Sequence, residues 1–133
     1  MNSTKIEERA LPIVLKIVDT TAKESLDTDG GQFYESSTIK GLNDTDKHWW
    51  PQAETVVGFL NAWQLTGKDD YFNQAQKTWD FIEKYIVDKK GGEWLWKVSK
   101  DRTPDETQDR AGFWKCPYHN SRACFEIMDR IKV

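Results

Sequence analysis

The strongest constraint in this sequence is an apolar pattern with helical spacing between residues 72 and 86. Five apolar residues follow one another at intervals of three, four, three and four: Phe72, Ala75, Trp79, Ile82 and Ile86. This spacing places the five side chains on one face of an α-helix, whereas a strand would require alternation. We predict a helix that is capped by Asp69 or Asp70 and broken by Gly91-Gly92.

Three other segments predict helices by the same criterion. The first runs from Ile6 to about Ser25, with Pro12 either near its start or at a bend. The second begins at Pro51 and ends at Gly67, and the last begins at Pro117, because proline suits the first turn of a helix. Their apolar stripes are Ala10, Val14, Ile17, Val18, Thr21 and Ala22; then Ala53, Val56, Val57, Leu60 and Trp63; then Ala123, Cys124, Ile127, Met128 and Ile131. The sequence predicts an all-α chain of four helices in two αα-hairpins.

The connections between these helices are long and rich in aromatic residues. Asp27–Gly31 resembles a calcium loop only faintly, because no bidentate Glu follows at the required spacing, and we interpret it as a turn. Residues 32–48 show no sustained period and are predicted to be loop. Trp94, Trp96 and Val98 alternate with polar or smaller neighbours, which predicts a short strand over residues 93–98. Residues 99–110 are charged and predict an exposed loop.

Composition excludes several classes of function. The chain has 133 residues, with 19 Lys and Arg against 22 Asp and Glu, so neither nucleic acid nor an anionic membrane is an expected partner. Its longest apolar run is far shorter than a membrane span, and no signal peptide is visible, so we expect a cytoplasmic protein. Cys116 and Cys124 would lie about 12 Å apart along a helix, too far for a disulfide. No residue spacing predicts a metal site or a bound cofactor.

Seven tryptophans stand out in a chain whose mean hydropathy is −0.77. Trp63 and Trp79 fall on apolar helical stripes and are predicted to be core. Trp94 and Trp96 are predicted to pack in a loop. The remaining three, Trp49, Trp50 and Trp114, come just before or at predicted helix starts. Tryptophan faces stack on the C–H faces of sugars, so these three residues predict a pocket for a small polar ring.

Two ionisable residues fall in the first turns of the helices that follow these tryptophans. We expect His119 to be a neutral imidazole that can accept a proton, because the positive end of the helix dipole disfavours its charged form. The alternative is a helix-terminal histidine bonded to backbone or to a carboxylate. Glu54 lies in the first turn of the second helix, where electrostatics alone would also explain it.

Two long segments resemble a known family. Trp49–Phe59, which reads WWPQAETVVGF, and Trp114–Asn120, which reads WKCPYHN, closely resemble the N-acylglucosamine 2-epimerase superfamily and, within it, the cellobiose 2-epimerases. The likeness runs from about residue 10 to residue 131. It implies an (α/α)6 toroid, of which residues 1–133 would be one partial domain, the C-terminal third, with helices ordered outer, inner, outer, inner.

The resemblance also implies roles for individual residues. His119 would be one of two catalytic histidines that remove and return the C2 proton of the reducing-end sugar, through an enediolate. Trp49, Trp50 and Trp114 would line the sugar site, and Glu54 would bond sugar hydroxyls or steady a histidine. His48 matches no functional position and is predicted to lie on the surface.

The implied activity interconverts glucose and mannose at the reducing end of cellobiose-type oligosaccharides. The second histidine and an arginine belong to earlier helices that this sequence lacks, so we expect the chain to be inactive without those N-terminal helices. Apolar faces that those helices would cover predict self-association. Three alternatives remain: an aldose–ketose isomerase, a non-catalytic carbohydrate-binding or interaction module, and a glycoside hydrolase fragment, for which Glu54 has no partner carboxylate.

Overall fold

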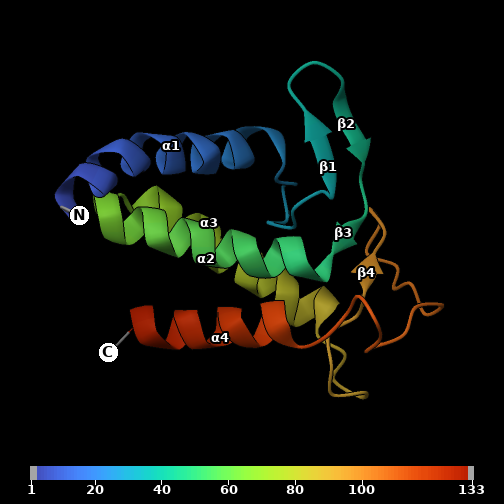
Figure 1. Cartoon of the computed structure of the whole chain (residues 1–133). Coiled ribbons are helices and arrows are strands. Elements are labelled where there is room, and N and C mark those ends of the chain that lie inside the picture. The colour runs from blue at the N-terminus through green and yellow to red at the C-terminus, as the bar shows by residue number, and fades with distance from the viewer. Residues whose placement is uncertain (1–2, 132–133) are drawn as a thin grey trace.

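The computed structural model describes residues 3–131, so the ends of the predicted domain 1–133 lie outside the described residues. Within this range there are four α-helices: α1 (Ser3–Glu24), α2 (Trp49–Thr66), α3 (Asp69–Phe81) and α4 (Tyr118–Arg130). The α3 helix continues into a π-helical turn, η1 (Ile82–Ile86). Figure 1 shows α2 between α1 and α4, with α3 behind it. The prediction of four helices in an all-α chain is confirmed.

Several helix ends differ from their predictions. The α2 helix begins two residues before Pro51, although it ends as predicted at Gly67, which is left-handed at φ 68° and donates its N–H to the Trp63 carbonyl. The prediction that Asp69 or Asp70 caps α3 is wrong, because Lys68 is the N-cap. Both carboxylates lie instead inside the first turn, where the helix dipole stabilises them.

The break at Gly91-Gly92 is also predicted too late. The helical stretch ends at Ile86, and Val87 is extended and forms an isolated bridge to Trp94. The Asp88 carboxylate then accepts the backbone N–H groups of Lys90 and Gly91 and closes the turn. A short polar side chain thus competes with the helix before the glycines are reached.

The loop prediction for residues 32–48 is wrong in part. This segment contains β1 (Glu35–Ser37) and β2 (Gly41–Asp44), which form an antiparallel hairpin, and β3 (Lys47–His48). The β1 and β2 strands are short and partly exposed and β3 has only two residues, so none of them carries an apolar alternation. The β3 strand pairs with β4 (Lys97–Val98), which confirms a strand within residues 93–98 and places it beside the start of α2.

The hydrophobic core is centred on α2. Its buried apolar side chains are Trp49, Ala53, Val56, Val57, Phe59, Leu60 and Ala62. Trp63 and Trp79 are partly buried against this core, and Trp63 packs on Phe72 with ring centroids 4.9 Å apart. Trp94 is buried, as its predicted packing role requires.

The α1 and α4 helices, which lie on either side of α2, bury only part of their predicted apolar stripes. On α1, which continues through Pro12 without ending, Val18 is buried but Ile17 is exposed. On α4, Ala123 is buried but Met128 and its neighbour Phe125 are exposed. The predicted stripes are therefore only partly buried, with Ala10, Ile17, Met128 and Ile131 exposed, because only one side of each helix has a neighbour within the described residues. No helix in residues 3–131 is both long and apolar enough to cross a membrane.

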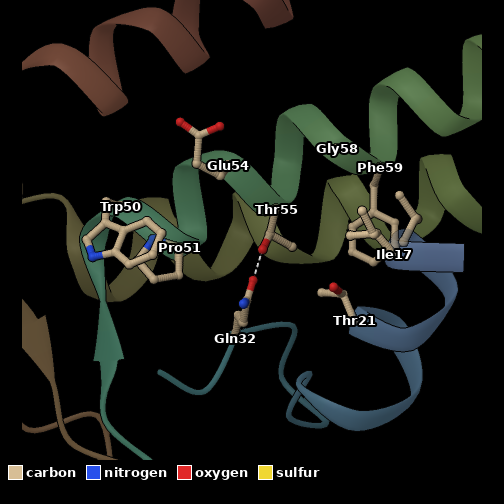
Figure 2. Close-up of a pocket in the computed structure, with 10 residues that line it drawn as sticks. Ile17, Thr21, Gln32, Trp50, Pro51, Glu54, Thr55, Gly58 and Phe59 are labelled. Carbon is tan, nitrogen blue, oxygen red and sulfur yellow. Dashed lines mark hydrogen bonds between the residues drawn. The ribbon is translucent and has the colours of Figure 1, made fainter. Parts of the chain in front are cut away.

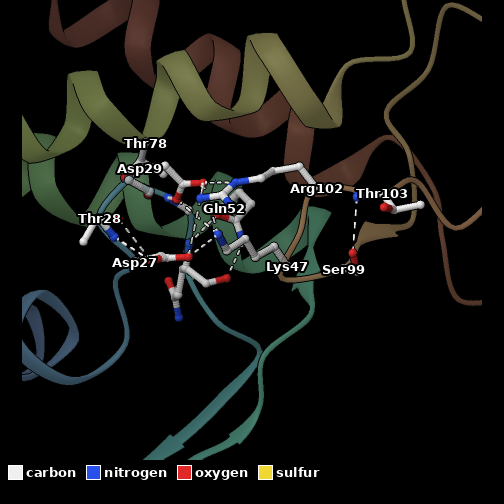
Figure 3. A network of polar contacts seen from close by, with 12 residues as sticks. Asp27, Thr28, Asp29, Lys47, Gln52, Thr78, Ser99, Arg102 and Thr103 are labelled. Atoms are coloured by element: carbon white, nitrogen blue, oxygen red, sulfur yellow. Dashed lines mark hydrogen bonds and ion pairs between the residues drawn. The ribbon is translucent and has the colours of Figure 1, made fainter.

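A buried lysine ties the predicted turn at Asp27–Gly31 to the start of α2. The Lys47 side chain is fully buried, and its ammonium lies 2.7 Å from Asp27 Oδ2 and 3.1 Å from Asp29 Oδ1. Arg102 reaches Asp29 from the loop at residues 99–110, at 2.7 Å (Figure 3). Burial opposes ionisation of Asp27, but its bonds to Lys47 and Thr28 and the charge of Arg102 outweigh it and lower its pKa. The turn is therefore a binding site for two cations of the same chain.

We expect Lys47→Met to lower the free energy of unfolding by about 3 kcal/mol, because it leaves two partly buried carboxylates with Arg102 alone. Urea denaturation followed by circular dichroism measures this change. Lys97→Met is the matched control, because the Lys97–Asp46 pair is partly exposed and is expected to contribute about 1 kcal/mol or less. Equal losses in the two variants would contradict a special role for Lys47.

Candidate functional site

An aromatic cavity of about 430 Å³ lies near the N-terminal ends of α2 and α4. Figure 1 shows these two ends on the same side of the molecule. The walls of the cavity come from the approach to β1, the end of β3 with the start of α2, the approach to β4, the loop leading into α4, and the first turn of α4. The lining residues are Tyr34, His48, Trp49, Trp50, Trp96, Trp114 and His119. This cavity, called the aromatic cavity below, is therefore lined by four of the seven tryptophans and by both histidines of the sequence.

His119 and Glu54, predicted separately, are brought into contact in the structure. His119 Nδ1 lies 2.9 Å from Glu54 Oε1, and the Trp50 ring centroid lies 5.9 Å from that of His119. A carboxylate only accepts hydrogen bonds, so the neutral imidazole donates from Nδ1 and keeps its lone pair on Nε2. The alternative of a carboxylate-bound histidine is thus correct in geometry, and it leaves one ring nitrogen able to take a proton.

The three tryptophans predicted to form a sugar platform differ in their surroundings. Trp114 is 80% exposed and Trp50 is 37% exposed, so both present ring surface to solvent. Trp49 lines the cavity but is only 5% exposed, because it packs on Trp96 and under the Lys115 ammonium. Its indole Nε1 is buried without a hydrogen-bond partner in the structure. Trp49 therefore belongs to the core as well as to the cavity wall.

Three cavity residues were not predicted from the sequence: Tyr34, His48 and Trp96. The prediction that His48 lies on the surface is wrong, because its ring is half-buried and stacks on Tyr34 at a centroid distance of 4.1 Å. Burial, together with the charge of Lys97, lowers the pKa of His48. Trp96 reaches the cavity only because β3 pairs with β4 and the Trp49 N–H binds the Trp96 carbonyl. The position of His48 beside Trp49-Trp50 was the one available signal.

A second buried lysine holds the loop that carries Trp114. Lys115 donates to the Arg110 carbonyl at 2.7 Å and lies 3.6 Å from Glu93. The same Glu93 carboxylate accepts from Asn120 Nδ2 at 2.5 Å, one residue after His119. Burial lowers the pKa of Lys115. This cluster therefore joins the Trp114 loop to the first turn of α4.

A smaller cavity of about 200 Å³ lies between α1 and α2 (Figure 2). Its wall is mainly apolar and includes Ile17 and Phe59, with a Thr55–Gln32 hydrogen bond on one side. Trp50 and Glu54 contribute to this wall as well. In Figure 2 the Glu54 carboxylate points away from Gln32 and Thr21. Among the described residues, no group of His, Cys, Asp or Glu side chains is placed to hold a metal ion.

Comparisons with known proteins identify similar chains. The sequence model of one family, N-acylglucosamine 2-epimerase (GlcNAc 2-epimerase), matches residues 3–123. Cellobiose 2-epimerase of Bacteroides fragilis is 43% identical over 117 residues, which are 88% of this chain and 30% of that protein. Cellobiose 2-epimerase of Dictyoglomus turgidum is 36% identical over 98% of this chain and 33% of its own length. The chain thus spans about a third of the length of these relatives.

Solved structures give the same result. A sugar epimerase from a ruminal bacterium superposes with a TM-score of 0.80 and 38% identity, over 90% of this chain and 30% of that one. A D-mannose isomerase superposes with a TM-score of 0.78 at 24% identity, which shows a shared fold alone. The described helices therefore match one part of the larger epimerase toroid.

We expect Trp49→Ala to lower the free energy of unfolding by about 3–5 kcal/mol, as for other buried tryptophans. Trp114→Ala is the matched control and is expected to change it by about 0.5 kcal/mol or less, because this ring is mostly exposed. Urea denaturation followed by circular dichroism separates the two without depending on tryptophan emission. A small effect at Trp49 would show that this residue is not part of the core.

Proposed function

Because the chain belongs to the N-acylglucosamine 2-epimerase family, we propose that it is part of a sugar 2-epimerase and that the aromatic cavity holds the reducing end of a cellobiose-type oligosaccharide. The observation that carries this proposal is the His119–Glu54 hydrogen bond at the wall of that cavity. It leaves a basic ring nitrogen beside aromatic surface, which suits proton transfer on a polar ring.

The proposed reaction begins at C2 of the open-chain sugar. The neighbouring carbonyl acidifies the C2 proton, and Nε2 of His119 removes it to give an enediolate. A second acid on the opposite face returns a proton to C2, which inverts its configuration and interconverts glucose and mannose. His119 then carries the proton that was removed, and the Glu54 carboxylate stabilises the resulting imidazolium.

The other site residues have binding roles in this proposal. Trp50 and Trp114 offer exposed ring faces for stacking on the C–H faces of the sugar, and Trp49 closes the cavity wall behind them. Glu54 steadies His119, and both of its oxygens already have partners on α4. Its proposed role is therefore to orient the histidine and not to bind a sugar hydroxyl.

We further propose that residues 1–133 form one part of a single toroidal domain, the C-terminal third. The second histidine and the arginine that stabilises the enediolate would come from N-terminal helices, so this chain alone would not catalyse. Those helices would cover apolar residues that are exposed on α1 and α4, such as Ile13 on α1 and Phe125 on α4. Without them, the same faces would promote self-association.

Complementation tests this proposal. We expect the N-terminal two-thirds of the Bacteroides fragilis relative, produced separately, to associate with this chain and to convert cellobiose to the epimer with a reducing-end mannose. Sedimentation is expected to show self-associated chains giving way to a mixed complex. His119→Asn is expected to lower the rate about 10²–10⁴-fold without preventing association.

Each part alone is the control and is expected to give no product. Association without any product would overturn the epimerase proposal. A ketose as the product would instead favour an aldose–ketose isomerase, the activity named for the D-mannose isomerase of similar fold.

A second candidate is a non-catalytic carbohydrate-binding module. It is favoured by the exposed rings of Trp50 and Trp114 at the wall of the aromatic cavity, which could bind a sugar without any catalytic group. It predicts that millimolar cellobiose changes the tryptophan fluorescence of the chain alone. We expect Trp114→Phe to weaken this response and Trp79→Phe, outside the cavity, to preserve it. No response at millimolar sugar would exclude this candidate.

A further inference from the structure

A row of charged side chains joins α2 to α4 beyond the aromatic cavity. On α4 it contains Arg122, Glu126 and Arg130, each four residues from the next. Arg130 lies 2.8 Å from Glu126 Oε2 and donates to Asn61 and Gln64 of α2 at 3.1 and 2.6 Å. At the other end of the row, Arg122 reaches Glu54 of α2. The row therefore ends on the carboxylate that binds His119.

Glu54 is held by α4 through both of its oxygens. Oε1 lies 2.9 Å from His119 Nδ1, and Oε2 accepts a hydrogen bond from Arg122 Nη2. Arg122 is itself oriented, because its Nη1 lies 3.6 Å from Glu126 Oε1 in an i,i+4 pair. His119 and Arg122 are three residues apart on α4, so they share one helix face and approach the same carboxylate side by side.

A second contact is needed because the Glu54 side chain is not fixed by burial. Its side chain is 36% exposed, and that of His119 is 34% exposed. A glutamate with this freedom samples several rotamers, and each one presents its oxygens differently. The planar guanidinium of Arg122 is a rigid donor that binds carboxylates with defined geometry, unlike a lysine ammonium.

We propose that Arg122 is a positioning residue that fixes the Glu54 carboxylate and thereby keeps the proton of neutral His119 on Nδ1. With the proton on Nδ1, Nε2 carries the lone pair that the proposed reaction requires. The role of this lone pair in catalysis rests on the proposed function, whereas the position of the proton does not.

Arg130 provides the matched control. It is the same residue type on the same helix, eight positions further on, and it also links α4 to α2. Among the described residues, the partners of its side chain are Glu126, Asn61 and Gln64, and Glu54 is not one of them. A residue that only docks α4 on α2 would behave like Arg130, whereas a positioning residue would change the His119 ring.

The test is long-range ¹H–¹⁵N NMR of the histidine rings in the full chain at about pH 8, where an ordinary histidine is neutral. The His119 signals are assigned by their loss in His119→Asn. We expect the wild-type ring to give one protonated and one unprotonated nitrogen shift, with Nδ1 protonated. In Arg122→Gln the two shifts are expected to move towards each other, as in a mixture of tautomers. Arg130→Gln is expected to match the wild type, and Arg122→Lys to recover only part of the separation.

Three results would overturn the proposal: unchanged shifts in Arg122→Gln, equal changes in Arg122→Gln and Arg130→Gln, or no change in Glu54→Ala, which removes the acceptor of the His119 Nδ1 proton. Circular dichroism verifies that each variant is folded, and the ring shifts are compared only among variants of equal helix content. If Arg122→Gln does not fold, Arg122→Lys is compared with Arg130→Lys by the same criterion.

Activity gives a separate readout. In the complemented enzyme, Arg122→Gln is expected to lower kcat about tenfold or more with little change in KM, as expected for loss of an orienting contact. If the complex is inactive while the tautomer still depends on Arg122, the proposed function fails and the positioning role stands. If the complex is active and the tautomer is insensitive to Arg122, the positioning role fails alone.

Discussion

The buried ammonium of Lys47 is the interaction on which the arrangement of the site depends. It lies directly before the residues that open α2, and it binds the carboxylates of a turn about twenty residues earlier in the chain. Arg102 joins the same carboxylates from a third segment. A fully buried charge must keep its partners, so these three segments are held around the start of α2. The walls of the aromatic cavity follow from that constraint.

The cavity forms because the chain brings the starts of α2 and α4 to the same end of the molecule. The start of α2 contributes Trp49 and Trp50, and the loop before α4 contributes Trp114. Glu54 of α2 and His119 of α4 then meet as the His119–Glu54 pair. A second buried lysine, Lys115, holds the α4 side as Lys47 holds the α2 side. Lys47 lies shortly before the start of α2 and Lys115 shortly before the start of α4, and both bind acidic or carbonyl oxygens.

The family relationship explains why some helices of this chain are covered by neighbours while others leave apolar residues exposed. The α2 helix contacts α1, α3 and α4, whereas α1 and α4 expose apolar residues. The chain covers about a third of its relatives, and the exposed faces lie on the helices at the edges of the layer. The proposed site has the same character, since in the proposed reaction the one histidine–carboxylate pair of this chain would act on a single face of the sugar.

The sequence by itself determined the four helices, the turn at Asp27–Gly31, the short strand near residue 97 and five candidate site residues. Apolar spacing, proline and glycine influence the backbone over only a few positions, so their effects can be predicted from the local sequence. The sequence could not show the β1–β2 hairpin, whose strands are short and partly exposed. Nor could it show that Tyr34, His48 and Trp96 line the cavity. Only the tertiary structure decided that Trp49 is core, that Glu54 binds His119, and that Arg122 holds Glu54. These contacts join residues 65 or more positions apart in two of the three cases, and pairing at such distance leaves no mark on local sequence.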